Sequence, residues 1–118
     1  MKKFYILLLI CLFISLIGRK NNKKITDEIA LNSIKNYCYS VFPDLKSMID
    51  LNEYGVNFEI VSSDDKEIVI LFKSYTGAIV KYYIDVKTGD TYATETVLAI
   101  SDKEMKTDEE FNIYDYIK

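Results

Sequence analysis

The sequence predicts an α+β fold in which one N-terminal amphipathic helix packs on a three- to four-stranded antiparallel sheet. Apolar residues recur at helical spacing before residue 43 and at alternate positions from residue 54 onward. Short turn segments separate the alternating stretches, as in a meander whose sheet curls against a helix. With 118 residues and 49% apolar side chains, the chain is long enough to bury one core, and we expect a single domain over residues 26–118.

The helix is expected from about residue 27 to residue 42. Thr26 is a good N-cap residue, and Asp27 and Glu28 place negative charge in the first turn, where it complements the helix dipole. The apolar positions at helical spacing are Ile29, Ala30, Ile34, Tyr37, Cys38 and Val41. Pro43 ends the run. Residues 44–55 then form a connector with room for one further helical turn.

The strands follow the connector. From Tyr54 the apolar period becomes two, which predicts a strand with one buried face. Residues 67–73 are apolar in both alternating sets, as in a central strand covered on both faces or a strand in a small packed interface. Two more strands are expected, at 78–86 and 91–98, after turns at 62–66, 74–77 and 87–90.

The last segment, residues 99–118, is expected to form a short C-terminal helix that packs on the sheet. Thr107 and Glu110 have the spacing of a capping box. Three larger side chains then lie three residues apart, namely Phe111, Tyr114 and Ile117. The alternatives are an extra edge strand and an arm that docks on a partner.

Residues 1–18 have the pattern of a signal peptide or membrane anchor. Two lysines precede a mostly apolar run from Phe4 to Ile17, and Gly18 follows. As a helix this run would reach about 21 Å, short of the roughly 30 Å of a bilayer core, which favours a cleaved signal peptide. Residues 19–25 form a basic linker, and basic residues directly after the apolar run resist translocation, which favours a retained anchor. We therefore expect a secreted or extracytoplasmic protein, membrane-anchored if the leader is retained.

The charge is divided unevenly along the chain. Residues 25–118 hold nine basic side chains and all eighteen acidic ones, a balance of about −9. Nucleic-acid binding needs a cationic face and is therefore disfavoured. The expected partner is a protein or a cell-envelope component, and contact with a membrane is expected only through an uncleaved leader.

The residues for common catalytic sites are missing. The chain contains no histidine, which removes the usual general base, the imidazole metal ligand and the nucleophile systems that depend on it. Cys38 is expected to be a small buried apolar residue on the helix, although a reactive thiol is the alternative. The acidic pair Asp64 and Asp65 and the run from Asp108 to Glu110 are typical of a solvated turn and a helix start. We expect no enzyme, no metal and no cofactor.

One short motif stands out in the stretch YYIDVKTGDTY, residues 82–92. A short hairpin with a type I turn needs a residue in the left-handed region just after the turn, and Gly89, after Thr88, meets this need. Asp85 and Asp90 then lie at opposite ends of the reversal, where carboxylates accept hydrogen bonds from turn amides or pair with Lys87. A structural hairpin is favoured over a calcium loop, because a lysine and a threonine stand where oxygen ligands would be required.

The same residues carry a family resemblance. The export signal, the single helix and a last hairpin with Asp85, Thr88, Gly89 and Asp90 resemble the PepSY domain, over about residues 26–98. The resemblance implies a small extracytoplasmic module of the kind found in protease propeptides and membrane-associated proteins, with a role in peptidase inhibition or ligand binding at the bacterial envelope. It implies no catalytic residues.

Together these features favour a non-enzymatic exported or envelope-associated binding or regulatory module. Tyr75, Tyr83 and Tyr92 are candidates for the contact surface, because tyrosine offers a large area with one polar group. The alternative for these rings is that they cover the core or stack across strands. The alternative for the whole chain is a membrane-tethered structural or accessory protein.

Overall fold

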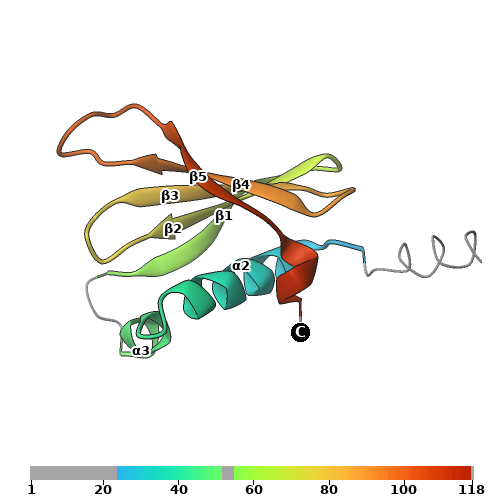
Figure 1. Cartoon of the computed structure of the whole chain (residues 1–118), viewed down its shortest axis with the longest axis horizontal. Helices are drawn as coiled ribbons and strands as arrows, with labels where there is room; N and C mark the ends of the chain where they lie inside the picture. Colours follow the sequence, from blue (N-terminus) through green and yellow to red (C-terminus); the bar gives the residue numbers. More distant parts are fainter. Residues whose placement is uncertain (1–23, 52–54, 118) are drawn as a thin grey trace, which may run out of the picture.

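One long helix packs on one face of a five-stranded antiparallel sheet in the computed structural model (Figure 1). The structure describes residues 24–51 and 55–117. The expectations for the leader, for most of the basic linker and for Tyr54 lie outside these residues. The described part contains no helix that is long and apolar enough to cross a membrane.

The helix α2, Asp27–Val41, begins and ends close to the expected residues. Thr26 caps it, because its hydroxyl accepts a hydrogen bond from the Ile29 amide at 3.2 Å. Its buried face carries Ala30, Ile34 and Cys38. Ile25 is also buried, so the core begins within the expected linker. The short helix α3, Leu45–Asp50, follows in the connector, where one further turn was expected.

The sheet is a meander in which each strand pairs with its neighbours in the chain. Its strands are β1 Asn57–Ser63, β2 Glu67–Lys73, β3 Ile79–Asp85, β4 Asp90–Thr96 and β5 Met105–Asn112, in the order β1-β2-β3-β4-β5. The α+β class and the antiparallel meander are confirmed, whereas the expected number of three to four strands is wrong. The extra strand is β5.

The core lies between α2 and the helix-facing side of the three central strands. The side chains that β2, β3 and β4 bury on this side are Ile68, Ile70, Phe72, Val80, Tyr82, Ile84 and Ala93. They alternate along each strand, because successive side chains point to opposite faces. Complete burial of one such aliphatic side chain contributes roughly 1.5–3 kcal/mol, so this layer holds the helix on the sheet.

Strands β1 and β2 differ in how well they fit the pattern in the sequence. In β2, Val69 is buried on the face opposite α2 and Leu71 is partly covered there, in agreement with a strand covered on both faces. In β1, by contrast, only Phe58 is partly buried, and every other residue of the strand is exposed. On the face expected to be buried, Val56, just before β1, is 3% exposed, and Phe58 packs against Tyr39 of α2. Ile60 is 37% exposed, so the expected buried face holds at Val56 and Phe58 and fails at Ile60.

The C-terminal segment is an edge strand, which was one of the expected alternatives, followed by a short 3-10 helix. After β5 comes η1, Ile113–Tyr116, which Asn112 caps by accepting a hydrogen bond from the Tyr114 amide at 2.9 Å. Phe111 stacks on Tyr37 of α2 with ring centroids 3.7 Å apart, and Ile113 is fully buried. Tertiary contacts thus override the capping-box spacing, since β4 offers an edge to pair with and α2 offers an aromatic surface.

Gly89 connects this C-terminal segment to the β3–β4 hairpin. Its φ of +81° lies in the left-handed region, and its carbonyl accepts a hydrogen bond from the Ile113 amide at 3.0 Å. A Cβ at this position would lie 2.8 Å from both the Asn112 Oδ1 atom and the Tyr114 ring. The position therefore requires glycine for its backbone angle and also for space.

Gly89→Ala should lower the free energy of unfolding by about 2 kcal/mol or more. An L-residue in the left-handed region costs roughly 1–2 kcal/mol, and the steric clash of the new Cβ with Asn112 and Tyr114 adds to this cost. Gly77→Ala is the matched control, because Gly77 has a similar φ of +88° but nothing within 4 Å of its Cβ position. Urea denaturation of both variants measures the difference. Equal losses would contradict a role for the contact with β5 and η1.

Candidate functional site

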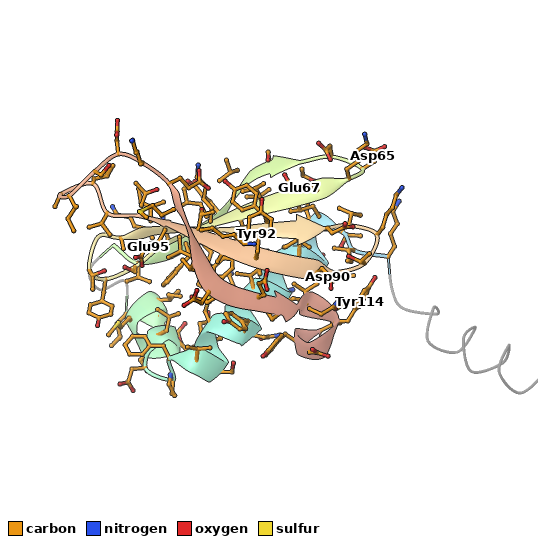
Figure 2. The ribbon with its side chains drawn as sticks, turned by 45° about the horizontal axis from the view of Figure 1, so that its top comes forward. Asp65, Glu67, Asp90, Tyr92, Glu95 and Tyr114 are labelled. Atoms are coloured by element: carbon orange, nitrogen blue, oxygen red, sulfur yellow. The ribbon has the colours of Figure 1, made fainter. Side chains whose placement is uncertain are left out.

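The candidate site lies on the outer face of the sheet, which we define as the face opposite α2. Register places Glu67 opposite Asp85, Val69 opposite Tyr83, and Tyr83 opposite Tyr92 on this face. No described helix covers it, as the two views in Figures 1 and 2 show. This face is thus the part of the sheet that is free to contact another molecule.

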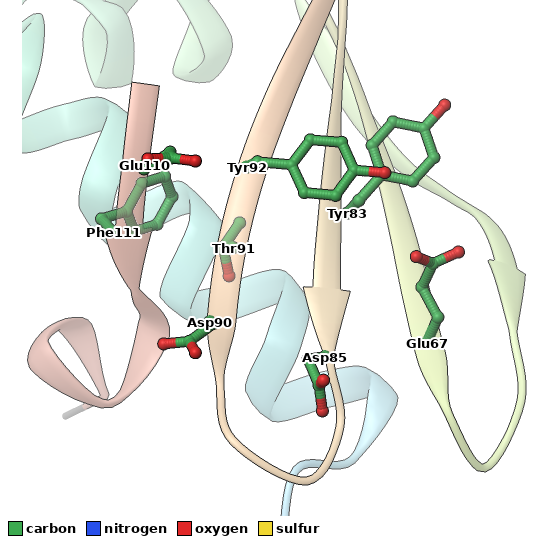
Figure 3. Close-up of a pocket in the computed structure, with 8 residues that line it drawn as sticks. All are labelled: Glu67, Tyr83, Asp85, Asp90, Thr91, Tyr92, Glu110 and Phe111. Carbon is green, nitrogen blue, oxygen red and sulfur yellow. The ribbon is translucent and has the colours of Figure 1, made fainter. Parts of the chain in front are cut away.

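A groove of about 560 Å³ crosses the outer face near the β3–β4 turn. We call it the outer groove, and Figure 3 shows its lining from four strands. The residues that line it are Glu67, Tyr83, Asp85, Asp90, Thr91, Tyr92, Glu110 and Phe111. Thr91 is the register partner of the buried Ile84, and Phe111 stacks on Tyr37, so these two side chains belong to the helix-facing side of the groove's wall. Four of the lining residues, Asp85, Asp90, Tyr83 and Tyr92, are candidates from the sequence, which relates the two aspartates through the turn but does not place the tyrosines beside them.

Two tyrosines form the aromatic part of the outer groove. Tyr83 and Tyr92 are direct partners in the β3–β4 register, and their rings stack with centroids 4.9 Å apart and planes 7° apart. The Lys106 ammonium lies 5.1 Å from the Tyr92 ring centroid and 3.3 Å from the Glu110 carboxylate. The exposed Tyr92 ring therefore already contacts a cation from the same chain.

The aspartates of the hairpin motif serve the turn. The Asp85 carboxylate accepts hydrogen bonds from the Lys87 amide at 2.8 Å and the Thr88 amide at 3.1 Å. The Thr88 hydroxyl in turn accepts one from the Asp90 amide at 3.1 Å. The Asp90 carboxylate accepts one from the Asn112 side-chain amide at 3.0 Å. The turn thus engages one oxygen of each of the two aspartate carboxylates.

Glu104 is a part of the outer face that the sequence did not reveal. It comes from the β4–β5 loop, and its carboxylate accepts hydrogen bonds from the Tyr83 and Thr94 hydroxyls and lies 3.9 Å from the Lys81 ammonium. The hydrogen bonds from Thr94 and Tyr83 lower the pKa of the Glu104 carboxyl. Burial and the bond to Glu104 raise the pKa of Tyr83 to about 12. No sequence spacing links these residues, because the loop brings them together only in the folded chain.

The three tyrosines of the expected contact surface do not lie together. Tyr83 and Tyr92 share the outer groove, whereas Tyr75 follows β2 at the other end of β3 and stacks on Phe42, with ring centroids 5.6 Å apart. Stacking across strands, the alternative for these rings, therefore describes the Tyr83–Tyr92 pair, but Tyr92 also remains 36% exposed. The candidate contact surface is reduced to the outer groove.

The only described cysteine is a buried part of the core. Cys38 is 5% exposed, and its Sγ atom lies 3.4 Å from the Tyr82 hydroxyl oxygen. Burial raises the pKa of the Cys38 thiol to about 12, which opposes formation of a nucleophilic thiolate. Among the described residues, no group of three acidic or cysteine side chains is placed to hold a metal ion.

The acidic wall of the outer groove gives a prediction about stability. Glu67 and Asp85 are directly opposite each other, and like charges in this position are destabilising by a few tenths of a kcal/mol to about 1 kcal/mol. Glu67→Gln should therefore raise the free energy of unfolding by about 0.5 kcal/mol at low salt. Asp65→Asn, which removes the same charge from the β1–β2 turn, should give a smaller gain. A gain that does not shrink in 1 M salt would contradict the electrostatic cause.

Cys38 should resist modification in the folded protein. In a Cys11→Ser variant, which leaves Cys38 as the only cysteine, a thiol reagent at pH 8 should react at least a hundredfold more slowly than in urea, because the folded thiol is both protonated and covered. Absorbance of the released chromophore gives the rate. Rapid reaction in the folded state would show that Cys38 is accessible.

Comparison with family models, with curated proteins and with solved structures finds no match to this chain. The resemblance to the PepSY domain is therefore neither supported nor opposed by these comparisons.

Proposed function

We propose that the chain is a non-enzymatic, exported or envelope-associated binding module that contacts a protein partner through the outer groove. The observation that carries this proposal is the groove itself, about 560 Å³ in volume and left uncovered by the described helices (Figures 1 and 2). Stacked tyrosines form part of its wall, and aromatic side chains are enriched in protein interfaces. The leader-like sequence of residues 1–18 supports the location.

Several features favour recognition over catalysis. The sequence has no histidine, Cys38 is buried, and the carboxylates of Asp85 and Asp90 are engaged in holding the turn. The remaining side chains of the outer groove offer charge and aromatic area at fixed positions. These are the means by which a surface selects a partner.

The finer proposal follows the PepSY resemblance, in which the partner is a peptidase and binding inhibits it. The acidic charge of about −9 over residues 25–118 supports a partner with a cationic surface. The hairpin with Asp85, Thr88, Gly89 and Asp90 contributes the fixed geometry of the groove and has no part in a reaction.

The test compares binding by two tyrosine variants of the full chain. Tyr92→Ala should reduce recovery of a cross-linked partner from the envelope fraction of the native host at least fivefold, because it removes the exposed ring of the outer groove. Tyr75→Ala is the matched control, since Tyr75 is also a partly exposed, stacked tyrosine but lies away from the groove. Quantitative mass spectrometry measures recovery.

Thermal unfolding of both variants checks that each one is folded, so that a lower recovery reflects weaker binding and not unfolding. If Tyr92→Ala recovers the same partner as the unmodified chain, the outer groove is not the contact surface. If no protein is enriched over a leader-only control, the module has no protein partner in that envelope. Peptidase activity of the recovered partner, with and without the purified chain, tests the inhibitory role.

A further inference from the structure

The sheet has two edge strands, β1 and β5, and they differ in how they meet solvent. Each edge strand presents unpaired N–H and C=O groups that another extended chain can pair with. Proteins protect such edges with charged side chains, bulges and short strands. The strand that lacks this protection is the better candidate for an interaction surface.

β5 is well protected. Four of its eight residues are charged, namely Lys106, Asp108, Glu109 and Glu110. Its register with β4 also jumps, from Tyr92 opposite Glu110 to Thr94 opposite Lys106, so three residues of β5 face a single residue of β4. The Thr107 hydroxyl fills this interruption by donating to the Ala93 carbonyl at 3.1 Å. A second strand cannot follow β5 in a regular ladder.

β1 has fewer of these protecting features than β5. Glu59 is its only charged residue, and the irregularity between Ile60 and Ser62 is limited to one unpaired residue, Val61. Ile60 is 37% exposed and Val61 is 48% exposed, so apolar side chains stand uncovered along the edge. The helix α2 lies against one face of β1 (Figure 1), and among the described residues no strand pairs with its outer edge.

The backbone of β1 is nevertheless held in place. Phe58 stacks on Phe72 of β2 with ring centroids 4.7 Å apart, and the Ser63 hydroxyl donates to the Asp27 carboxylate at 2.5 Å. These contacts fix both ends of the strand. An incoming chain would therefore meet a preformed template and would not have to order it.

The charges around β1 indicate the kind of chain that fits. Glu59, Asp65 and Glu67 lie on or beside the β1–β2 hairpin. None of them takes part in the two ion pairs of the described residues, which are Lys81–Glu104 and Lys106–Glu110. Lys66 and Lys73 are the cations nearest in sequence. A second copy of the chain would bring another balance of about −9 to this edge and would be repelled. A cationic segment would be attracted.

We propose that β1 accepts an extended cationic segment of a partner protein by strand addition. The segment pairs its backbone with the free edge of Asn57–Ser63, covers Ile60 and Val61 with alternate apolar side chains, and places basic side chains toward Glu59 and the acidic hairpin. A seven-residue strand spans about 24 Å, which is suited to a short extended segment. This surface shares Glu67 with the outer groove but is centred on the free edge of β1, and strand addition there does not require a partner in the groove.

The test uses the full chain in a non-ionic detergent with three synthetic peptides. The probe is a ten-residue peptide of alternating valine and lysine carrying a fluorophore, and anisotropy measures its binding. A proline–lysine peptide has the same charge but cannot pair as a strand. A valine–glutamate peptide has the opposite charge. We expect the first peptide to bind at least tenfold more tightly than either of the others.

Two variants locate the site. Val61→Lys should weaken binding of the valine–lysine peptide at least tenfold, because it puts a like charge on the open edge. Met105→Lys is the matched control, since Met105 is an exposed apolar residue at the start of the opposite edge strand, and its effect should stay within about twofold. Both substitutions change the net charge by the same amount.

Amide hydrogen exchange on the unmodified chain gives a readout that does not depend on either variant folding. Protection on peptide addition should be confined to residues 57–63. Protection over residues 105–112, equal binding of the proline–lysine peptide, or equal effects of the two variants would overturn the proposal. Concentration-dependent dimerisation of the chain with protection of residues 57–63 in the absence of peptide would also overturn it, in favour of a second copy at this edge.

Discussion

The contact between the β3–β4 turn and the C-terminal segment is the constraint on which most of this structure depends. Gly89 reverses the chain at a positive φ, and the Ile113 amide and the Asn112 side chain bind the same turn. The turn thereby fixes the register of β3 and β4, which places Tyr83 against Tyr92. It also fixes the end of β5, the fifth strand, and so positions Phe111 to stack on Tyr37 of α2. The packing of the core and the shape of the outer groove thus both depend on the β3–β4 turn.

The two faces of the sheet have different physical roles as a result. The helix side is closed by aliphatic side chains and by the aromatic contacts of Tyr37, Tyr82 and Phe111. The outer face is held by polar contacts, among which the Glu104 carboxylate joins the β4–β5 loop to Tyr83 and Thr94. A rigid core on one side gives the outer groove a fixed shape, and a site with a fixed shape loses less entropy on binding. The open edge at β1 benefits from the same rigid support.

Much of the fold was predictable because the local signals were strong. Thr26 and Pro43 bracket the helix, the alternating residues of β3 identify a strand, and the Thr88-Gly89 step predicts the reversal, each for reasons that involve only neighbouring residues. Where local and tertiary signals conflict, the prediction failed. Thr107 and Glu110 have helical capping spacing, yet they lie in β5, because pairing with β4 and stacking on α2 outweigh a cap of about 1 kcal/mol.

For the candidate site, the sequence by itself determined which groups are present: an acidic domain without histidine, a hairpin that holds its own aspartates, and tyrosines on the strands. Only the tertiary structure decided which of them meet. It stacked Tyr83 on Tyr92, set Tyr75 apart on Phe42, and brought Glu104 to the outer face from a loop. It also left β1 uncovered while β5 carries the protecting charges. The reason is that composition and periodicity are properties of neighbouring residues, whereas register, edges and loop contacts depend on how distant segments pack.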